Sequence, residues 1–148
     1  MARGDFTLFG EFGRDGFAKQ HDLSTDVISM GIITTAVTPV SSQTDPKWGT
    51  YSANQVSTDD SQYPGPITLT GVALTTVSSL VTMFDSSAIE LTQNSSAFTD
   101  AGWGIIYNNS HSSDLAIGFL DLGGPVDLTA GPITITPNSS GWARITVS

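Results

Sequence analysis

The chain has 148 residues, no cysteine and a formal net charge of −9. This length suits one domain with a buried core, and the lack of cysteine excludes disulfides and thiolate metal sites. Acidic residues outnumber basic ones by 14 to 5, so the surface repels phosphate and we expect no nucleic-acid partner. No apolar run approaches the ~20 residues of a membrane span, and no apolar segment follows the first residues. We therefore expect neither a membrane partner nor a secretory signal.

Residues 1–22 differ from the rest of the chain and are interpreted as an N-terminal aromatic arm. Its aromatic residues are Phe6, Phe9, Phe12 and Phe17. The first three recur at intervals of three, which favours one or two turns of helix with an aromatic stripe, although the glycines between them disfavour a long helix. Two interpretations stay open: the arm packs on its own domain, or it docks on a partner subunit. In the second case, removal of residues 1–17 is expected to leave the body folded.

From residue 23 onward, short apolar segments alternate with turns, and we interpret residues 23–148 as a β-rich body. The predicted strands are 27–35, 67–74, 77–84, 88–91, 103–107, 115–122, 126–128, 133–136 and 142–147. The first reads as largely buried, and the glycines and proline at 123–125 are predicted to end the strand before them. This spacing predicts an all-β fold, a single antiparallel β-sandwich of jelly-roll-like or immunoglobulin-like topology.

A long polar stretch over residues 40–65 interrupts the strand pattern. Trp48 and Tyr51 lie within it, and we expect them to pin part of it to the core. A loop of this length is usually functional or mobile. With Tyr63, these aromatic residues offer an alternative function, because a loop aromatic can stack against a sugar.

The residues suited to chemistry do not form a recognisable catalytic or metal-binding pattern. His21 and His111 have no neighbouring His or Cys at metal-ligand spacing, and both are predicted to lie at the surface. The adjacent pair Asp59 and Asp60 is predicted to face water. The other candidate calcium ligands are Asp22, Asp26, Asp121 and Asp127. None of them fits an EF-hand loop, so we interpret them as turn residues and expect no catalytic residue, cofactor or metal.

Five segments spread over nearly the whole chain carry a family resemblance. They are GDFTLF at 4–9, HDLSTD at 21–26, the Trp48 and YSAN residues within 48–54, GIIYN at 104–108 and AIGFLDLGG at 116–124. Together they resemble a group of small virion proteins of tailed double-stranded DNA bacteriophages. The resemblance implies a structural role at the capsid, and these motifs carry no chemistry.

The function implied by the resemblance is that of a capsid decoration, or cement, protein. Such a protein is made in the host cytoplasm, binds the lattice of the major capsid protein on the capsid exterior and stabilises the mature head. It needs no active site, and it either acts alone or forms a homo-oligomer. The candidate capsid-binding residues are Phe6, Phe9, Phe12, Phe17 and Arg14. The alternatives are a phage tail or head-fibre component and a glycan-binding β-sandwich.

Overall fold

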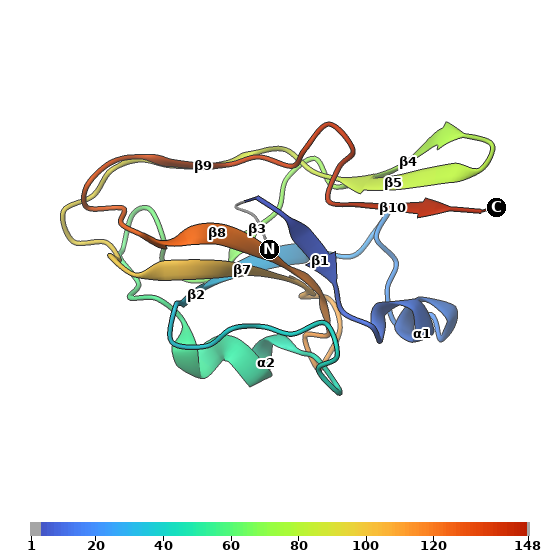
Figure 1. Cartoon of the computed structure of the whole chain (residues 1–148), viewed down its shortest axis with the longest axis horizontal. Helices are drawn as coiled ribbons and strands as arrows, with labels where there is room; N and C mark the ends of the chain where they lie inside the picture. The colour runs from blue at the N-terminus through green and yellow to red at the C-terminus, as the bar shows by residue number, and fades with distance from the viewer. Residues whose placement is uncertain (1–3, 148) are drawn as a thin grey trace.

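The computed structural model describes residues 4–147, and in this part of the chain ten strands form three antiparallel sheets (Figure 1). The strands are β1 (Phe6–Leu8), β2 (Ile28–Thr34), β3 (Ile67–Thr68), β4 (Ala73–Ser78), β5 (Val81–Asp85), β6 (Ile89–Leu91), β7 (Ala101–Asn108), β8 (Ala116–Val126), β9 (Ile133–Ile135) and β10 (Ala143–Thr146). The helical segments are α1 (Phe12–Phe17), α2 (Trp48–Tyr51) and the 3₁₀ turn η1 (Ser52–Asn54). The all-β sandwich predicted from the sequence is confirmed.

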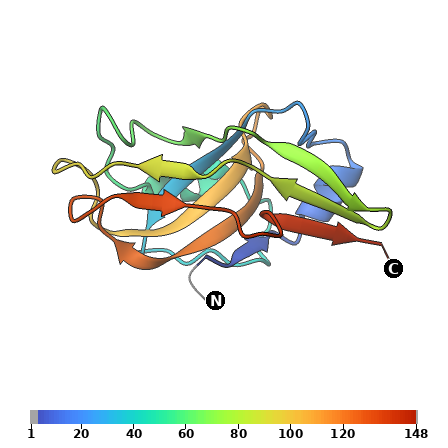
Figure 2. The same cartoon turned by 90° about the horizontal axis from the view of Figure 1, so that it is seen from above.

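The sheets form two layers. The large sheet has the order β1-β8-β7-β2-β3, and the opposite layer contains the sheet β10-β5-β4 and the pair β6-β9 (Figures 1 and 2). The interior strand β2 is covered on both faces, so its residues Ile28 to Ile33 are all buried. A strand covered on both faces reads as a continuous apolar run, which explains why the buried strand predicted at 27–35 is confirmed.

Two hydrophobic clusters form the core. One lies between the two layers, and the other lies on the outer face of the large sheet. In the second cluster, the Trp48 ring of α2 stacks on Tyr107, with centroids 5.5 Å apart and an interplanar angle of 7°. Trp48 and Tyr51 are 9% and 3% exposed. They pin the long polar stretch to the core, as predicted.

Three predicted strand assignments are wrong. The predicted strand 77–84 crosses the turn between β4, which ends at Ser78, and β5, which begins at Val81. The predicted strand 67–74 is split at Gly71, whose φ of +63° turns the chain from β3 in the large sheet to β4 in the opposite layer. The predicted turn at 123–125 does not end a strand, because β8 continues to Val126, which pairs with Ala101. Gly124 lies so close to the Ala101 carbonyl that a side chain there would collide with it. A glycine that signals a turn in the sequence thus permits a close approach within the sheet.

The aromatic segment is part of the domain rather than a free arm. Residues 6–8 form β1, which pairs with β8 through Phe6 and Leu120, and Phe9 precedes α1, so the predicted helical stripe is wrong at Phe6 and at Phe9. Gly118 permits this pairing, since an added Cβ would lie 2.6 Å from the Thr7 carbonyl oxygen and would meet the Phe6 ring. In the described chain the segment packs on its own domain, the first of the two interpretations. Residues 1–3 of the predicted arm lie outside the described residues.

Candidate functional site

Three of the five predicted capsid-binding residues pack against the chain itself. Phe9 is 1% exposed, and its ring stacks on Tyr51 with a centroid distance of 5.9 Å. The Phe6 ring lies 5.7 Å from that of Trp142, and Phe12 is partly buried against the main core. These rings belong to the packing of the domain, and Phe9 is not accessible to a partner.

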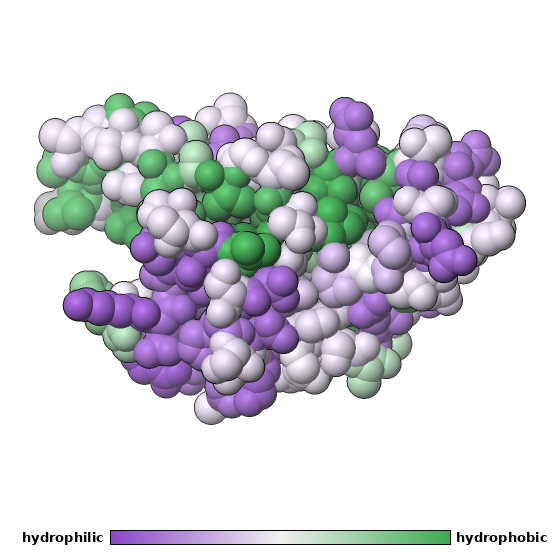
Figure 3. Space-filling model, turned by 180° about the vertical axis from the view of Figure 1, so that it is seen from behind, coloured by the Kyte–Doolittle hydropathy of each residue, from purple (hydrophilic) through white to green (hydrophobic). Residues whose placement is uncertain are grey.

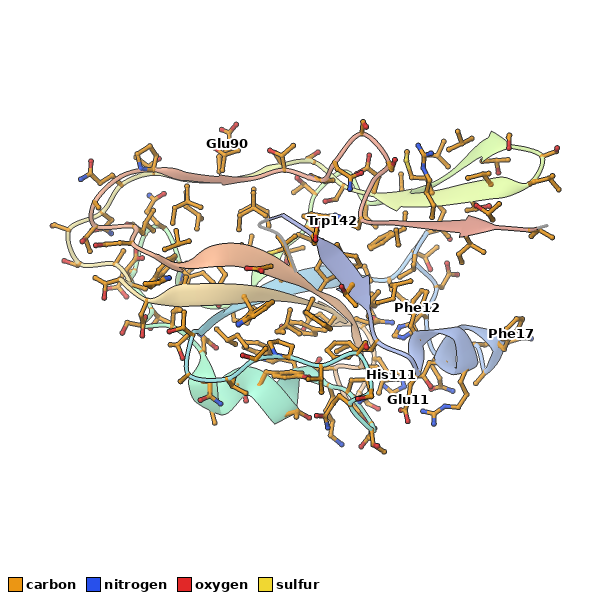
Figure 4. All side chains as sticks on the ribbon, viewed as in Figure 1. Glu11, Phe12, Phe17, Glu90, His111 and Trp142 are labelled. Atoms are coloured by element: carbon orange, nitrogen blue, oxygen red, sulfur yellow. The ribbon has the colours of Figure 1, made fainter. Side chains whose placement is uncertain are left out.

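The other two predicted residues, Phe17 and Arg14, are exposed on α1 at one end of the molecule. Phe17 is 94% exposed and points away from the body (Figure 4). Arg14 Nη2 donates to Glu11 Oε2 at 2.8 Å and to Asp15 Oδ1 at 2.9 Å. The hydrogen bond to Asp15, followed by the charges of both carboxylates, raises the pKa of Arg14. Glu11 also accepts the Asp45 N–H at 3.0 Å, which ties α1 to the polar stretch.

An apolar groove of about 590 Å³ runs between α1 and β10, and we call it the notch. Its lining is almost entirely apolar or glycine. The lining residues are Leu8, Phe9, Gly10, Phe12, Gly13, Gly16, Phe17 and Ile145. Figure 3 shows the molecule from behind, with hydrophobic surface gathered above a hollow and hydrophilic surface below it. The notch therefore joins one of the two exposed predicted residues, Phe17, to a hydrophobic surface.

The roof of the notch is the sheet β10-β5-β4, which extends beyond the end of the large sheet (Figures 1 and 2). Leu74 and Phe84 are paired across this sheet, and so are Ile145 and Thr82. Paired residues share a face, and Phe84 is buried, so Leu74 and Ile145 lie on the face directed toward the body. Ile145 is nevertheless 57% exposed, and Val147 beyond it is 63% exposed. Part of an inward apolar face is thus left uncovered.

The wall formed by α1 contains glycines that the domain does not need. A Cβ added at Gly13 or at Gly16 would meet no atom within 4 Å. Glycine inside a helix costs about 1 kcal/mol relative to alanine, and no contact within the described chain accounts for that cost. Because glycine has no side chain, the surface of α1 at these positions lets the backbone of another molecule approach closely.

A buried polar network fixes the chain that follows α1. Asn108 Nδ2 donates to Asp26 Oδ2 at 2.6 Å and to the Gln20 carbonyl oxygen at 3.2 Å, and His111 Nε2 lies 2.8 Å from Gln20 Oε1. Both histidines are partly buried, so their predicted surface position is wrong. Burial is the largest cause that lowers the pKa of His21, and its Nε2 is buried without a hydrogen-bond partner. The notch meets this region through Phe12, whose ring lies 5.5 Å from that of His21.

The prediction that Asp59 faces water is also wrong. Asp59 is buried, and its Oδ1 accepts the N–H groups of Ser61 at 2.9 Å and Gln62 at 2.6 Å, while Oδ2 accepts the Tyr63 N–H at 3.1 Å. These hydrogen bonds, led by that of Gln62, lower the pKa of the carboxyl group. Asp60 is exposed, as predicted. Asp59 therefore closes a loop and is not presented to a substrate.

The remaining acidic candidates act in turns. Asp22, Asp121 and Asp127 each accept the N–H of the residue two positions later, which is the Asx-turn pattern. Among residues 4–147, no group of three or more His, Asp or Glu side chains is arranged to hold a metal ion.

The aromatic residues proposed to stack on a sugar have other partners. Trp48 and Tyr51 belong to the second hydrophobic cluster. Tyr63 is fully buried, and its hydroxyl accepts the Ile32 N–H at 2.8 Å. None of the three rings offers an open face at the surface.

No protein-family model, curated protein or solved structure matches this chain. Within the described residues, no helix has the length and apolar character needed to cross a membrane.

Proposed function

We propose that this chain is a non-enzymatic capsid decoration protein of a tailed bacteriophage, which binds the lattice of the major capsid protein through the notch. The observation that supports this best is Phe17, a large aromatic side chain that is 94% exposed at the rim of an apolar groove. Aromatic residues beside apolar pockets are typical of protein–protein contact sites. The sequence resemblance supplies the phage capsid as the setting.

The notch is suited to binding because its walls are fixed in advance. On one side, Phe9 anchors the start of α1 in the core, and Glu11 at the N-cap of α1 accepts the Asp45 N–H of the polar stretch. A surface that is already ordered loses little conformational entropy when a partner binds. Copies bound only to the mature lattice would stabilise that lattice by mass action.

The test is co-sedimentation of the purified chain with expanded heads that were assembled without it. Wild-type protein should saturate at a copy number that matches lattice positions. Phe17→Ser and Ile145→Ser should each weaken binding about tenfold or more, as expected for an interface anchor worth at least ~1.4 kcal/mol. Val40→Ser is the matched control, because Val40 is an exposed apolar residue outside the notch lining, and it should bind as the wild type does.

Two results would contradict this proposal in different ways. Equal binding by all three variants would remove the notch as the docking surface while leaving the decoration role in place. Failure of the wild type to bind heads, with the protein present at low copy in virions, would favour the tail or head-fibre alternative.

The glycan-binding alternative has a separate test. Its three candidate aromatic rings are buried, so a glycan array should give no signal above background. A specific glycan signal would require another part of the surface to bind sugar.

A further inference from the structure

The strand β4 leaves one edge of its sheet without a neighbour. In the order β10-β5-β4 it pairs with β5 alone within the described part of the chain. Five of its six residues are exposed. An edge strand presents a row of N–H and C=O groups that are free to pair with another strand.

The chemistry of this edge differs from that of the rest of the protein. The sequence contains no Asp, Glu, Lys, Arg or His between Ser61 and Phe84, although the whole chain carries a net charge of −9. Half of the strand ALTTVS consists of Thr and Val, which favour strands, and it contains no proline. Devices that usually protect an edge are charges, prolines, bulges and short length, and β4 shows only a register shift after Thr76.

The other edge strands of the described sheets are protected. In the large sheet, the edge strands β1 and β3 have three and two residues. The paired strands β6 and β9 have three residues each, and β6 carries Glu90. At the opposite edge of its own sheet, β10 carries the exposed Arg144. Among these strands, β4 is the longest edge and has the least protection.

We propose that two copies of this chain pair through their β4 edges, antiparallel about a two-fold axis, to form a continuous six-stranded sheet. A second copy is the occupant that the charge pattern favours. Most of the acidic surface would bring carboxylates together if it met itself, whereas β4 meeting β4 brings no charged side chain against another. The same patch serves both partners, as an isologous interface requires.

The pairing should be weak and should respond to salt. The regular part of the edge is limited to Ala73–Thr76 by the register shift, and so short an edge buries less area than a standard stable interface. Each copy also repels the other through its net charge of −9. Because salt screens this repulsion, association should increase with ionic strength.

The absence of native cysteine allows a direct test in the full chain. In an antiparallel pair about a two-fold axis, one residue lies opposite its own copy, within the narrow distance range that a disulfide spans. We would introduce Leu74→Cys, Thr75→Cys and Thr76→Cys one at a time, with Thr146→Cys on β10 as the control at the opposite edge. After mild oxidation, the fraction of disulfide-linked dimer would be measured on non-reducing gels at several protein concentrations.

The proposal expects one β4 position to cross-link far more than its neighbours and Thr146→Cys to remain monomeric. It also expects sedimentation velocity to show wild-type protein moving from 15.5 kDa toward twice that mass as concentration and salt rise. The double substitution Thr75→Lys/Thr76→Lys should abolish that shift, because like charges would then face each other across the axis, whereas Thr146→Lys should not.

Several results would overturn it. Wild-type protein that stays monomeric at the highest soluble concentration, equal cross-linking at all four positions, or dimerisation that survives the double lysine substitution would each exclude the β4 edge. None of these measurements uses capsids, so they leave the proposed decoration role untouched. If both proposals hold, the dimer carries two notches and binds a lattice bivalently, which raises its apparent affinity.

Discussion

At the scale of single residues, polar side chains that read as solvent-exposed in the sequence hold loops together. Asp59 organises three successive backbone N–H groups, and Asn108 joins the start of β2 to the chain after α1. The sequence shows these residues only as members of polar stretches. Their partners lie across turns or in distant segments, so their burial follows from the tertiary structure.

Asp59→Ala should lower the free energy of unfolding by about 1–3 kcal/mol, because buried N–H groups would lose their acceptor. Urea denaturation measures this difference, and the exposed neighbour Asp60 gives the matched control, Asp60→Ala, which should stay within about 0.5 kcal/mol of wild type. The pKa of Asp59 is lowered in the folded protein. Its contribution is therefore present above the ordinary carboxyl pKa and is lost as pH falls through the lowered value. A difference between wild type and Asp59→Ala that persists at low pH would contradict this role.

His21 should make the protein less stable in mild acid. Burial lowers its pKa, and the nearby charge of His111 acts in the same direction, while Asp15 and Asp26 oppose it. The unfolded chain therefore binds a proton at a higher pH than the folded chain does. Stability is full above the ordinary histidine pKa and declines as pH falls through it. The free energy of unfolding should fall more between pH 7.5 and pH 5.5 for wild type than for His21→Gln. An equal fall in the two proteins would show that His21 does not contribute.

At the scale of elements, the glycines beside β1 and within α1 are of two kinds. Gly118 is required by contact, since a Cβ there would meet the Phe6 ring and the Thr7 carbonyl oxygen of the paired strand β1. Gly13 lies in α1 with open space around it. In the sequence, both are simply glycines near apolar residues. Only the pairing of β1 with β8 in the folded chain shows that Gly118 is crowded and Gly13 is not.

The same substitution should therefore have opposite effects at these two positions. Gly118→Ala should destabilise the fold by about 1–3 kcal/mol through overpacking, and Gly13→Ala should stabilise it by about 0.5–1 kcal/mol through helix propensity. Urea denaturation of both variants measures the effects. If the glycine wall of the notch receives a partner, Gly13→Ala should also bind heads less well despite its greater stability. Unchanged binding would show that the partner contacts Phe17 and Ile145 without approaching Gly13 closely.

At the scale of the whole molecule, the N-terminal segment completes one edge of the sandwich and also forms one wall of the notch. β1 forms one edge of the large sheet, and Phe9 fills the second hydrophobic cluster. Folding and the proposed binding surface thus share residues. Point substitutions at the exposed positions are therefore a sharper test of binding than a truncation.

Removal of residues 1–17 should destabilise the protein, contrary to the expectation that these residues can be removed while the body stays folded. Loss of a buried phenylalanine alone costs about 3–5 kcal/mol, and the truncation also exposes the edge of β8. Urea denaturation should show a much lower midpoint for the truncated chain. A truncate with wild-type stability would show that residues 1–17 form a separable arm after all.

The sequence by itself determined the properties that arise from local pattern. The all-β class, the buried strand at 27–35 and the anchoring by Trp48 and Tyr51 follow from apolar runs, turn residues and isolated aromatics. These features depend on neighbours along the chain. Phe17 and Arg14 are exposed on α1 and Phe9 is buried, but periodicity did not separate them.

Only the tertiary structure decided which face each of these side chains occupies. Phe9 points into the core because α2 and its loop cover that face of the large sheet, whereas Ile145 stays exposed because its sheet extends beyond any covering layer. Strand pairing between distant segments likewise places β3 and β4 in different sheets. The contact between Gln20 and His111 also joins segments that are far apart in the sequence. Such pairing leaves no periodic signal in the sequence, so the notch and the free β4 edge are properties of the folded molecule.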